Sequence, residues 1–524
     1  MSGGTAELGR FSLHLPWARQ SAFNRTVGAV LAVGAVCTAL LTISGIINFR
    51  DVSYPDSATL LRIGEFVHTG RLYPHIDEPP YLVTLYGPLT YLLLSIPYVL
   101  GEVAGIEPQV AVRCGVVLCL SVCLLWSFRI GSRLYGASAA QLALLFTLSA
   151  IPLSGWSTQI RGDFAGIACS LTGIYLFLGE CTRRRVVAAA LCAGAAMLFK
   201  QMLLATAATI VLSLTVQRRF KDAVIAGLCI TMTVAVLNAL MLWREPLMLT
   251  HLAALGAPVF EYRGAVGLVA KAILQPMIPA AILGAALLCC DRKRPEALKS
   301  RIFLVYAALA WSVAIATSLQ IGGNMNYFLE PLFASSVLAG SGIQTLGRLS
   351  PRVQSVVALT VLLLLTRSAV ADVRDLRQFY YQESGYGQRK DAWRAFVAAI
   401  SRRRVLSTLP DVTVHSRLPE VPDPYLNTVL VKGGKWSYEP IVAELDAGAF
   451  DLVIVTKGDS FRGPYHRGLP FWTANVWNAL ERRYVAACEL DERQIWLPRS
   501  TDIPVDLKAI GCRTDAQNHS SGGR

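Results

Sequence analysis

Charged residues are scarce in this chain. They make up 16% of its 524 residues, whereas hydrophobic residues make up 53%. A soluble globular protein carries about 25% charged residues, so a soluble enzyme is excluded. The composition predicts an integral membrane protein with one polar region at its C-terminal end.

Several catalytic motifs are also missing. The sequence has no G-x-x-x-x-G-K-[ST], H-E-x-x-H or G-x-S-x-G, which argues against ATP-driven transport by this chain alone and against zinc peptidase or serine esterase chemistry. The cysteines lack metal-ligand spacing, and those in apolar segments are expected to be packing residues. Cys488 and Cys512 stand alone in the polar region, where they could form a disulfide if their geometry permits.

Long apolar runs fill most of the sequence before residue 372. A membrane-spanning helix needs about 20 apolar residues, and we predict a polytopic α-helical protein with about eleven spans. The expected cores are 27–48, 110–128, 137–156, 163–180, 186–199, 201–217, 222–243, 265–290, 302–321, 327–346 and 353–371.

The basic residues indicate the orientation of these spans. The net charge is +14, and basic residues cluster in short connections at 129–133, 183–185, 218–221, 292–301 and 348–352. Such clusters mark the cytoplasmic side, so nucleic acid is rejected as a partner. The apolar segment 82–103 must then be re-entrant or interfacial, since as a span it would move these clusters outside. We predict a multi-pass plasma (inner) membrane protein with a cytoplasmic N-terminus and an extracytoplasmic C-terminal domain.

This topology gathers the polar connections on the outer face. The transmembrane domain is expected to cover 1–371 and to include an outer catalytic loop, 49–109; the other outer connections are 157–163, 199–201, 244–264 and 322–327. Because residues suited to catalysis lie there and most basic residues lie opposite, the candidate site is placed at the outer surface.

Asp56 is the first candidate in the outer loop. It precedes Leu60, Ile63 and Val67, whose helical spacing predicts a short interfacial helix. A helix N-terminus favours an anion, and a carboxylate there can accept a proton from an incoming hydroxyl. The alternative is a simple helix cap, a position that Asp often occupies.

Two cations and a second acid come next. Lys200 sits between two spans, where its ammonium can hold a phosphate as a point charge; the alternative is a lysine that extends to the interface from a helix end. Arg161 and Asp163 open another span, and ionisable residues at that depth are either functional or paired with each other.

A polar patch marks the start of the 327–346 span. It holds Asn324, Asn326, Tyr327 and Glu330 after a glycine pair. Glu330 lies about one turn inside, where it could bind sugar hydroxyls or a cation, or could cap the helix.

Short motifs across this region resemble those of the GT-C superfamily of membrane glycosyltransferases, which includes protein O-mannosyltransferases and bacterial aminoarabinose transferases. The matching segments are Tyr54-Pro55-Asp56-Ser57, Gly70-Arg71-Leu72-Tyr73, Tyr86-Gly87-Pro88-Leu89, Ala111-Val112-Arg113, Arg161-Gly162-Asp163 and Phe199-Lys200. The superfamily often has Asp-Glu where this chain has Asp56-Ser57, which leaves the subfamily open.

The resemblance implies transfer of a sugar from a polyprenyl-phosphate donor to an extracytoplasmic glycan, lipid or protein acceptor, usually with inversion. Asp56 matches the position of the general base, and Lys200 with Arg161 would stabilise the leaving phosphate. The substrate pocket would add Asp163, Tyr54, His75, Tyr86 and the polar patch. Membrane lipids would surround the site. Some relatives use a divalent metal ion, for which the candidate ligands are Asp51, Asp56 and His75.

The C-terminal region is predicted to form a small α/β domain over 372–514, followed by a disordered tail, 515–524. Helices are expected at 389–403, 438–445 and 473–483, and strands at 404–407, 412–415, 451–456, 484–490 and 494–497.

Two other function classes remain open. A secondary transporter would show related halves and broken helices near the middle of the membrane, and no internal repeat is evident. A non-catalytic membrane assembly subunit, or a polysaccharide polymerase or ligase of the cell envelope, is the other alternative.

Overall fold

The structure is a computed structural model of the full chain. It describes residues 22–47, 54–84, 86–149, 156–180, 182–254, 262–290, 297–320, 323–346, 349–383, 386–408, 418–420, 427, 430–431, 433–456, 472–490, 493–499 and 507.

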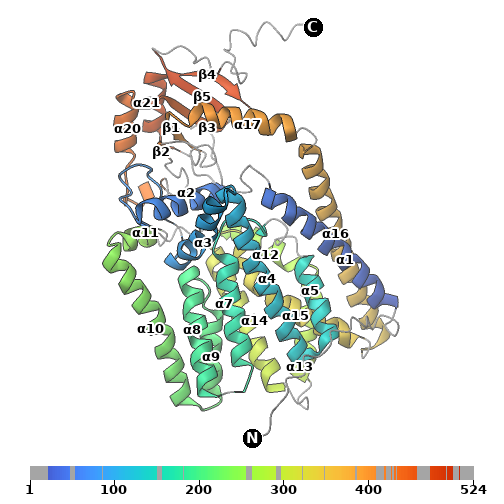
Figure 1. The fold of residues 1–524 in the computed structure, drawn as a ribbon. Helices are drawn as coiled ribbons and strands as arrows, with labels where there is room; N and C mark the ends of the chain where they lie inside the picture. The colour runs from blue at the N-terminus through green and yellow to red at the C-terminus, as the bar shows by residue number, and fades with distance from the viewer. Residues whose placement is uncertain are drawn as a thin grey trace, which may run out of the picture.

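A bundle of helices forms the larger part of the molecule, and a small sheet lies at one end of it (Figure 1). The helices of the bundle are α1 (Ala22–Ile47), α2 (Tyr54–Thr69), α3 (Pro88–Ala104), α4 (Pro108–Tyr135), α5 (Ala137–Leu148), α7 (Asp163–Phe177), α8 (Arg183–Phe199), α9 (Ala205–Val216), α10 (Phe220–Arg244), α11 (Met248–Ala254), α12 (Tyr262–Ile273), α13 (Met277–Cys290), α14 (Ala297–Ser318), η2 (Met325–Phe328), α15 (Leu329–Thr345) and α16 (Pro351–Glu383).

Within the described residues, five helices are long and apolar enough to cross a membrane: α1, α4, α10, α14 and the first part of α16. The pair α12 and α13 makes a sixth if it counts as one span, and α3, α5, α7 and α9 are apolar but shorter. The molecule is therefore a mostly helical protein with several apolar spans, as the sequence predicts. The count of eleven spans stays a prediction.

The predicted span 265–290 is bent. Its two halves, α12 and α13, meet at an angle of 71°. Pro276 lies in the break between Ile273 and Met277, and proline lacks the backbone N–H that a continuous helix needs. The apolar run alone gave no sign of this bend.

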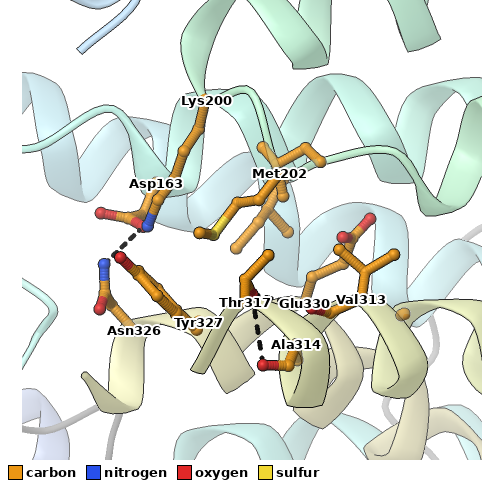
Figure 2. Close-up of a pocket in the computed structure, with 12 residues that line it drawn as sticks. Asp163, Lys200, Met202, Val313, Ala314, Thr317, Asn326, Tyr327 and Glu330 are labelled. Atoms are coloured by element: carbon orange, nitrogen blue, oxygen red, sulfur yellow. Dashed lines mark hydrogen bonds and ion pairs between the residues drawn. The ribbon is translucent and has the colours of Figure 1, made fainter. Parts of the chain in front are cut away.

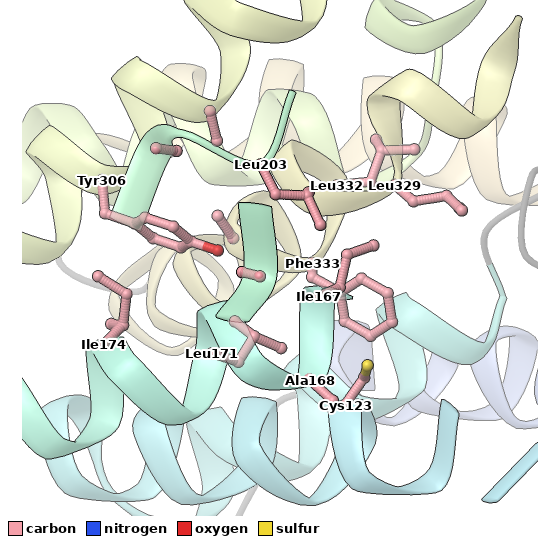
Figure 3. Close-up of a cluster of buried hydrophobic side chains, with 14 of the residues drawn as sticks. Cys123, Ile167, Ala168, Leu171, Ile174, Leu203, Tyr306, Leu329, Leu332 and Phe333 are labelled. Atoms are coloured by element: carbon pink, nitrogen blue, oxygen red, sulfur yellow. The ribbon is translucent and has the colours of Figure 1, made fainter. Parts of the chain in front are cut away.

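Helix α15 runs through the centre of the bundle and is buried on nearly every side. A Cβ atom added to Gly340 would lie 2.1 Å from the carbonyl oxygen of Ala139, and one added to Gly342 would lie 2.0 Å from that of Ala280. Small residues therefore let α5 and α13 approach its backbone closely. Figure 3 shows the larger side chains of α15, including Phe333, packed with Ile167 and Leu171 of α7.

Helix α16 connects the bundle to the C-terminal region (Figure 1). It has 33 residues, and it continues to Glu383 although the composition becomes polar from Asp372 onward. The amphipathic helix α17 (Tyr386–Ile400) follows.

The C-terminal sheet has five strands in the order β2-β1-β3-β5-β4. The strands are β1 (Arg404–Ser407), β2 (Leu418–Glu420), β3 (Leu452–Thr456), β4 (Tyr484–Leu490) and β5 (Arg493–Pro498), and the helices α20 (Glu439–Asp446) and α21 (Ala474–Arg483) accompany them. Strand β1 pairs in parallel with β2 and β3, and β5 pairs antiparallel with β3 and β4.

Most elements of this region lie where the sequence predicts them. The short strand β2 was not predicted. The predicted strand 412–415 and the tail 515–524 lie outside the described residues. Cys488 in β4 is disulfide-bonded; Cys512 also lies outside the described residues.

The loop after α2 shares a hydrophobic core with the C-terminal region. Ile76, Tyr81 and Val83 belong to the same buried cluster as Trp436 and Tyr438. The side-chain amide of Asn427 also donates to the carbonyl oxygen of Tyr81 at 3.1 Å. The sheet region is thus built partly on the loop in which the sequence places the catalytic residues.

Candidate active site

The polar connections at the sheet end of the bundle contact one another. Thr90 donates to the carbonyl oxygen of Phe199 at 3.1 Å, next to Lys200. A Cβ on Gly87 would lie 1.9 Å from the carbonyl oxygen of Leu198, so only glycine permits this approach. These contacts place the 49–109 loop against the 199–201 turn.

Glu245, which follows α10, holds the other side of the loop. Its carboxylate oxygens accept from the backbone N–H groups of Leu72 at 2.9 Å and Tyr73 at 3.3 Å. A buried backbone N–H needs such a partner. The described parts of the 244–264 connection and of the 49–109 loop therefore form one unit.

His251 in α11 adds a second clamp on the loop. Its Nδ1 atom accepts from the N–H of Thr84 at 3.0 Å, and its Nε2–H donates to the carbonyl oxygen of Pro74 at 2.7 Å. Only the neutral imidazole makes both bonds. Burial, with Arg62 and His75 nearby, lowers the pKa of His251 from 6.5 to about 4, against the opposing effect of the bond to Pro74.

We expect this clamp to weaken in acid. The His251 pKa is lower in the folded protein than in the unfolded chain, so its stabilisation is complete above pH 6.5 and is lost as the pH falls towards 4. Normalised hydrogen exchange of residues 72–84 should therefore rise across this interval in the wild type. In His251→Phe it should be fast at every pH. The exposed His68 provides a control, since His68→Gln should behave like the wild type; a pH response that survives in His251→Phe would assign the effect to another group.

Asp163 and Lys200 form the centre of the candidate site. The ammonium of Lys200 donates to the Asp163 carboxylate, which also accepts from the Asn326 amide at 3.1 Å. Arg161 approaches the second carboxylate oxygen at 3.4 Å. One acid thus holds two cations, because Asp163 pairs with both Arg161 and Lys200. The pairing expected as one alternative is present, and the functional role stays a prediction.

Aromatic rings cover these cations. The Arg161 guanidinium lies 4.7 Å from the ring centre of Trp156 and 5.7 Å from that of Tyr86. Lys200 Nζ lies 4.8 Å from the ring centre of Tyr327. A ring face attracts a cation and excludes water from it, which fixes both positive groups in place.

A pocket opens beside this centre (Figure 2). Its lining residues come from α7, the turn after α8, α14, η2 and α15: Asp163, Ile167, Lys200, Met202, Leu203, Ala310, Val313, Ala314, Thr317, Asn326, Tyr327 and Glu330.

Glu330 lies inside this pocket among buried hydroxyl groups. Its Oε1 atom accepts from the Ser170 hydroxyl and, at 3.1 Å, from the Tyr306 hydroxyl. The Ser170 and Thr206 hydroxyls are also hydrogen-bonded, at 2.6 Å. Glu330 is therefore anchored to α7 and α14, and is not simply a helix cap.

Asp56 lies in the first turn of α2 and is fully buried, with an exposed fraction of 0%. Its Oδ2 atom is 3.3 Å from the guanidinium of the equally buried Arg113, and its Oδ1 atom accepts from the N–H of Ile160 at 2.8 Å. Asp56 does not line the pocket. It contacts Ile160, the first residue of the 160–163 segment, and Asp163 is the last residue of that segment.

The remaining predicted residues lie in several places. Tyr54 begins α2, but its side chain and all of Asp51 lie outside the described residues. His75 is exposed beside the sheet region. Asn324 is exposed, and its side chain accepts from the N–H of Met325 at 2.8 Å, which makes it the cap of η2. The structure thus places His75 and Asn324 outside the pocket, because each belongs to a loop surface.

Of the candidate metal ligands, Asp56 and His75 lie in the described part of the chain, and Asp51 lies outside it. No group of three His, Cys, Asp or Glu side chains suited to a metal ion occurs there. Both oxygens of Asp56 already bind Arg113 and Ile160.

Several residues of the site were missed in the sequence. Nothing in the sequence indicates that Trp156 belongs to the site, because its contact with Arg161 is known only from the fold. Ser170, Thr206 and Tyr306 lie within apolar helices, where single hydroxyl groups are common. Arg113 was noted only as part of a motif; a charged residue inside an otherwise apolar helix is the signal that identifies it.

No protein-family model and no curated protein matches this sequence. Among solved structures, the chain is similar to ArnT from Cupriavidus metallidurans bound to undecaprenyl phosphate, with 14% identity, a TM-score of 0.58, and coverage of 92% of this chain and 100% of that one. The apo state of the same protein matches with 13% identity, a TM-score of 0.58, and coverage of 90% and 98%. The chain therefore has the fold of a GT-C glycosyltransferase, and the resemblance seen in its motifs is confirmed at the level of the fold.

Proposed function

We propose that this protein is a membrane glycosyltransferase whose donor is a sugar carried on a polyprenyl phosphate. The fold shared with ArnT, which has been solved with undecaprenyl phosphate bound, is the observation that carries this proposal. Because a fold alone does not determine a function, the chemistry of the pocket is the second support. Two cations pair there with one carboxylate, and of these groups Lys200 and Asp163 line the pocket.

In the proposed reaction, a hydroxyl oxygen of the acceptor attacks the anomeric carbon of the donor. The new carbon–oxygen bond forms as the bond to the lipid phosphate breaks, and the polyprenyl phosphate leaves with the bonding electrons. Attack from the opposite side inverts the configuration. Lys200 and Arg161 stabilise the negative charge that develops on the phosphate, while Asp163 keeps both cations in position.

Asp56 is the proposed general base, which accepts the proton of the attacking hydroxyl. It accepts a hydrogen bond from the N–H of Ile160, the residue that directly precedes Arg161, and Arg113 balances its charge. Since Asp56 is fully buried, the 156–163 segment must move aside for an acceptor to reach it. The acceptor is an extracytoplasmic glycan, lipid or protein in this proposal.

The proposal is tested by comparing cells that make the protein with cells that lack it. Mass spectrometry should show one polyprenyl-phosphate sugar accumulating when the protein is absent, together with loss of the corresponding envelope product. Restoring the wild-type chain should reverse both changes. Unchanged lipids and products would contradict the proposal, and a change confined to oligosaccharides on polyprenyl diphosphate would favour a polymerase or ligase.

A further inference from the structure

The proposed reaction assigns no role to Glu330, one of the acidic residues of the pocket. Glu330 is only 4% exposed and lines the pocket. Ser170 and Tyr306 both donate to its Oε1 atom. Among the described contacts, Oε2 is therefore the oxygen that a ligand would meet. A buried carboxylate is costly unless its oxygens are satisfied, so a hydrogen-bond donor from the ligand would be favourable here.

Asn326 provides a second acceptor in the same pocket. Its amide nitrogen donates to Asp163, which fixes the orientation of the side chain. The amide oxygen is buried and has no hydrogen-bond partner within the described residues. The residue is only 3% exposed. An orphaned acceptor of this kind is uncommon in native structures and indicates a ligand that brings its own donor.

The two acceptors lie on different sides of the pocket. Figure 2 shows Asn326 beside Asp163 and Lys200, with Glu330 across the pocket from them. Tyr327, which lies beside Asn326, and Val313, which lies beside Glu330, also line the pocket. A flat apolar surface combined with separated acceptors suits a monosaccharide ring, which has apolar ring faces and hydroxyl donors at its edge.

We propose that this pocket is the sugar subsite of the donor, in which Glu330 and Asn326 accept hydrogen bonds from hydroxyl groups of a neutral monosaccharide. The inference rests on the proposed function and names the part of the donor that fills the pocket. The phosphate stays at Lys200 and Arg161, because the carboxylate of Glu330 repels it. The lipid chain has no donor group for either acceptor.

The test measures how purified full-length protein binds two probes: undecaprenyl phosphate, and undecaprenyl phosphate that carries one neutral hexose. The wild type should bind the glycosylated lipid about 10-fold or more tightly, as expected for hydrogen bonds to buried acceptors, one of them charged. Glu330→Gln should lose most of this difference and keep its affinity for the bare lipid phosphate. Ser336→Ala is the matched control on α15, since the Ser336 hydroxyl bonds to the carbonyl oxygen of Leu332 within its own helix.

Asn326→Ala supplies a second variant if Glu330→Gln does not fold, and it should also lose part of the preference for the glycosylated lipid. Equal preference in the wild type and in a folded pocket variant would overturn the sugar subsite. So would a wild type that binds both lipids equally. If the wild type binds neither lipid, the proposed function itself fails.

Discussion

Replacing Lys200 with methionine is expected to lower the transfer rate by about 100-fold to 1,000-fold, the range seen when one preorganised charge-stabilising group is removed. Lys200 is 11% exposed, lines the pocket and contacts Asp163. Methionine keeps much of the length and apolar character of the side chain but removes the cation that would face the leaving phosphate. The measurement is the rate of polyprenyl phosphate release by purified protein, once the donor is identified.

A structural role for Lys200 can be separated from a catalytic one. In Lys200→Met, the buried Asp163 keeps Arg161 and Asn326 but loses its nearest cation, which is itself destabilising. The double variant Lys200→Met/Asp163→Asn removes the excess charge and should recover thermal stability without recovering transfer. Recovery of transfer in the double variant would show that Lys200 serves only the fold.

Lys271 on α12 is a matched cation that does not line the pocket. Its side chain is exposed, so Lys271→Met should leave transfer unchanged. A secondary transporter would show the opposite pattern if Lys271 lay on its transport path. Comparing the two lysines thus tests the transferase against the strongest alternative from another class.

Asp56→Asn is expected to lower transfer by about 100-fold to 10,000-fold, the range for loss of a general base. Asparagine can still accept from the N–H of Ile160, so its geometry is close to that of the acid. It cannot accept the proton of the attacking hydroxyl. The measurement is the rate of transfer by the purified variant relative to the wild type at a fixed pH.

Loss of the Asp56 charge also leaves Arg113 buried without its counter-charge, which costs about 3–5 kcal/mol. The double variant Asp56→Asn/Arg113→Gln pairs two neutral groups and should regain stability, measured by thermal unfolding in detergent. If it also regains transfer, Asp56 is a structural residue. The pocket acids Asp163 and Glu330 would then be the remaining candidates for the base.

The outline of this fold follows from the sequence because apolar length and strand alternation are local signals. The predicted tail helices 438–445 and 473–483 correspond to α20 and α21. The bend between α12 and α13 also has a local cause in Pro276, although an apolar run on its own reads as one span. The proline is visible in the sequence, but a hydropathy average over the whole apolar run does not reveal the bend that it causes.

The geometry of the site is different, because its contacts join distant parts of the chain. Asp56 pairs with Arg113, 57 residues away, and Ser170 with Glu330, 160 residues away. No spacing rule reaches across such distances. The sequence therefore identified most residue types of the candidate site, whereas the burial of Asp56 and the joining of Lys200 to Asp163 required the fold.

The shared core of the 49–109 loop and the C-terminal region has a consequence for engineering. Tyr81 and Val83 pack with Trp436 and Tyr438 as one unit. A chimera that takes its tail from a relative would place foreign side chains against this loop unless residues 72–84 are exchanged with it. If the C-terminal region determines acceptor preference, that preference would be transferred to another protein only when residues 72–84 and the C-terminal region are exchanged together.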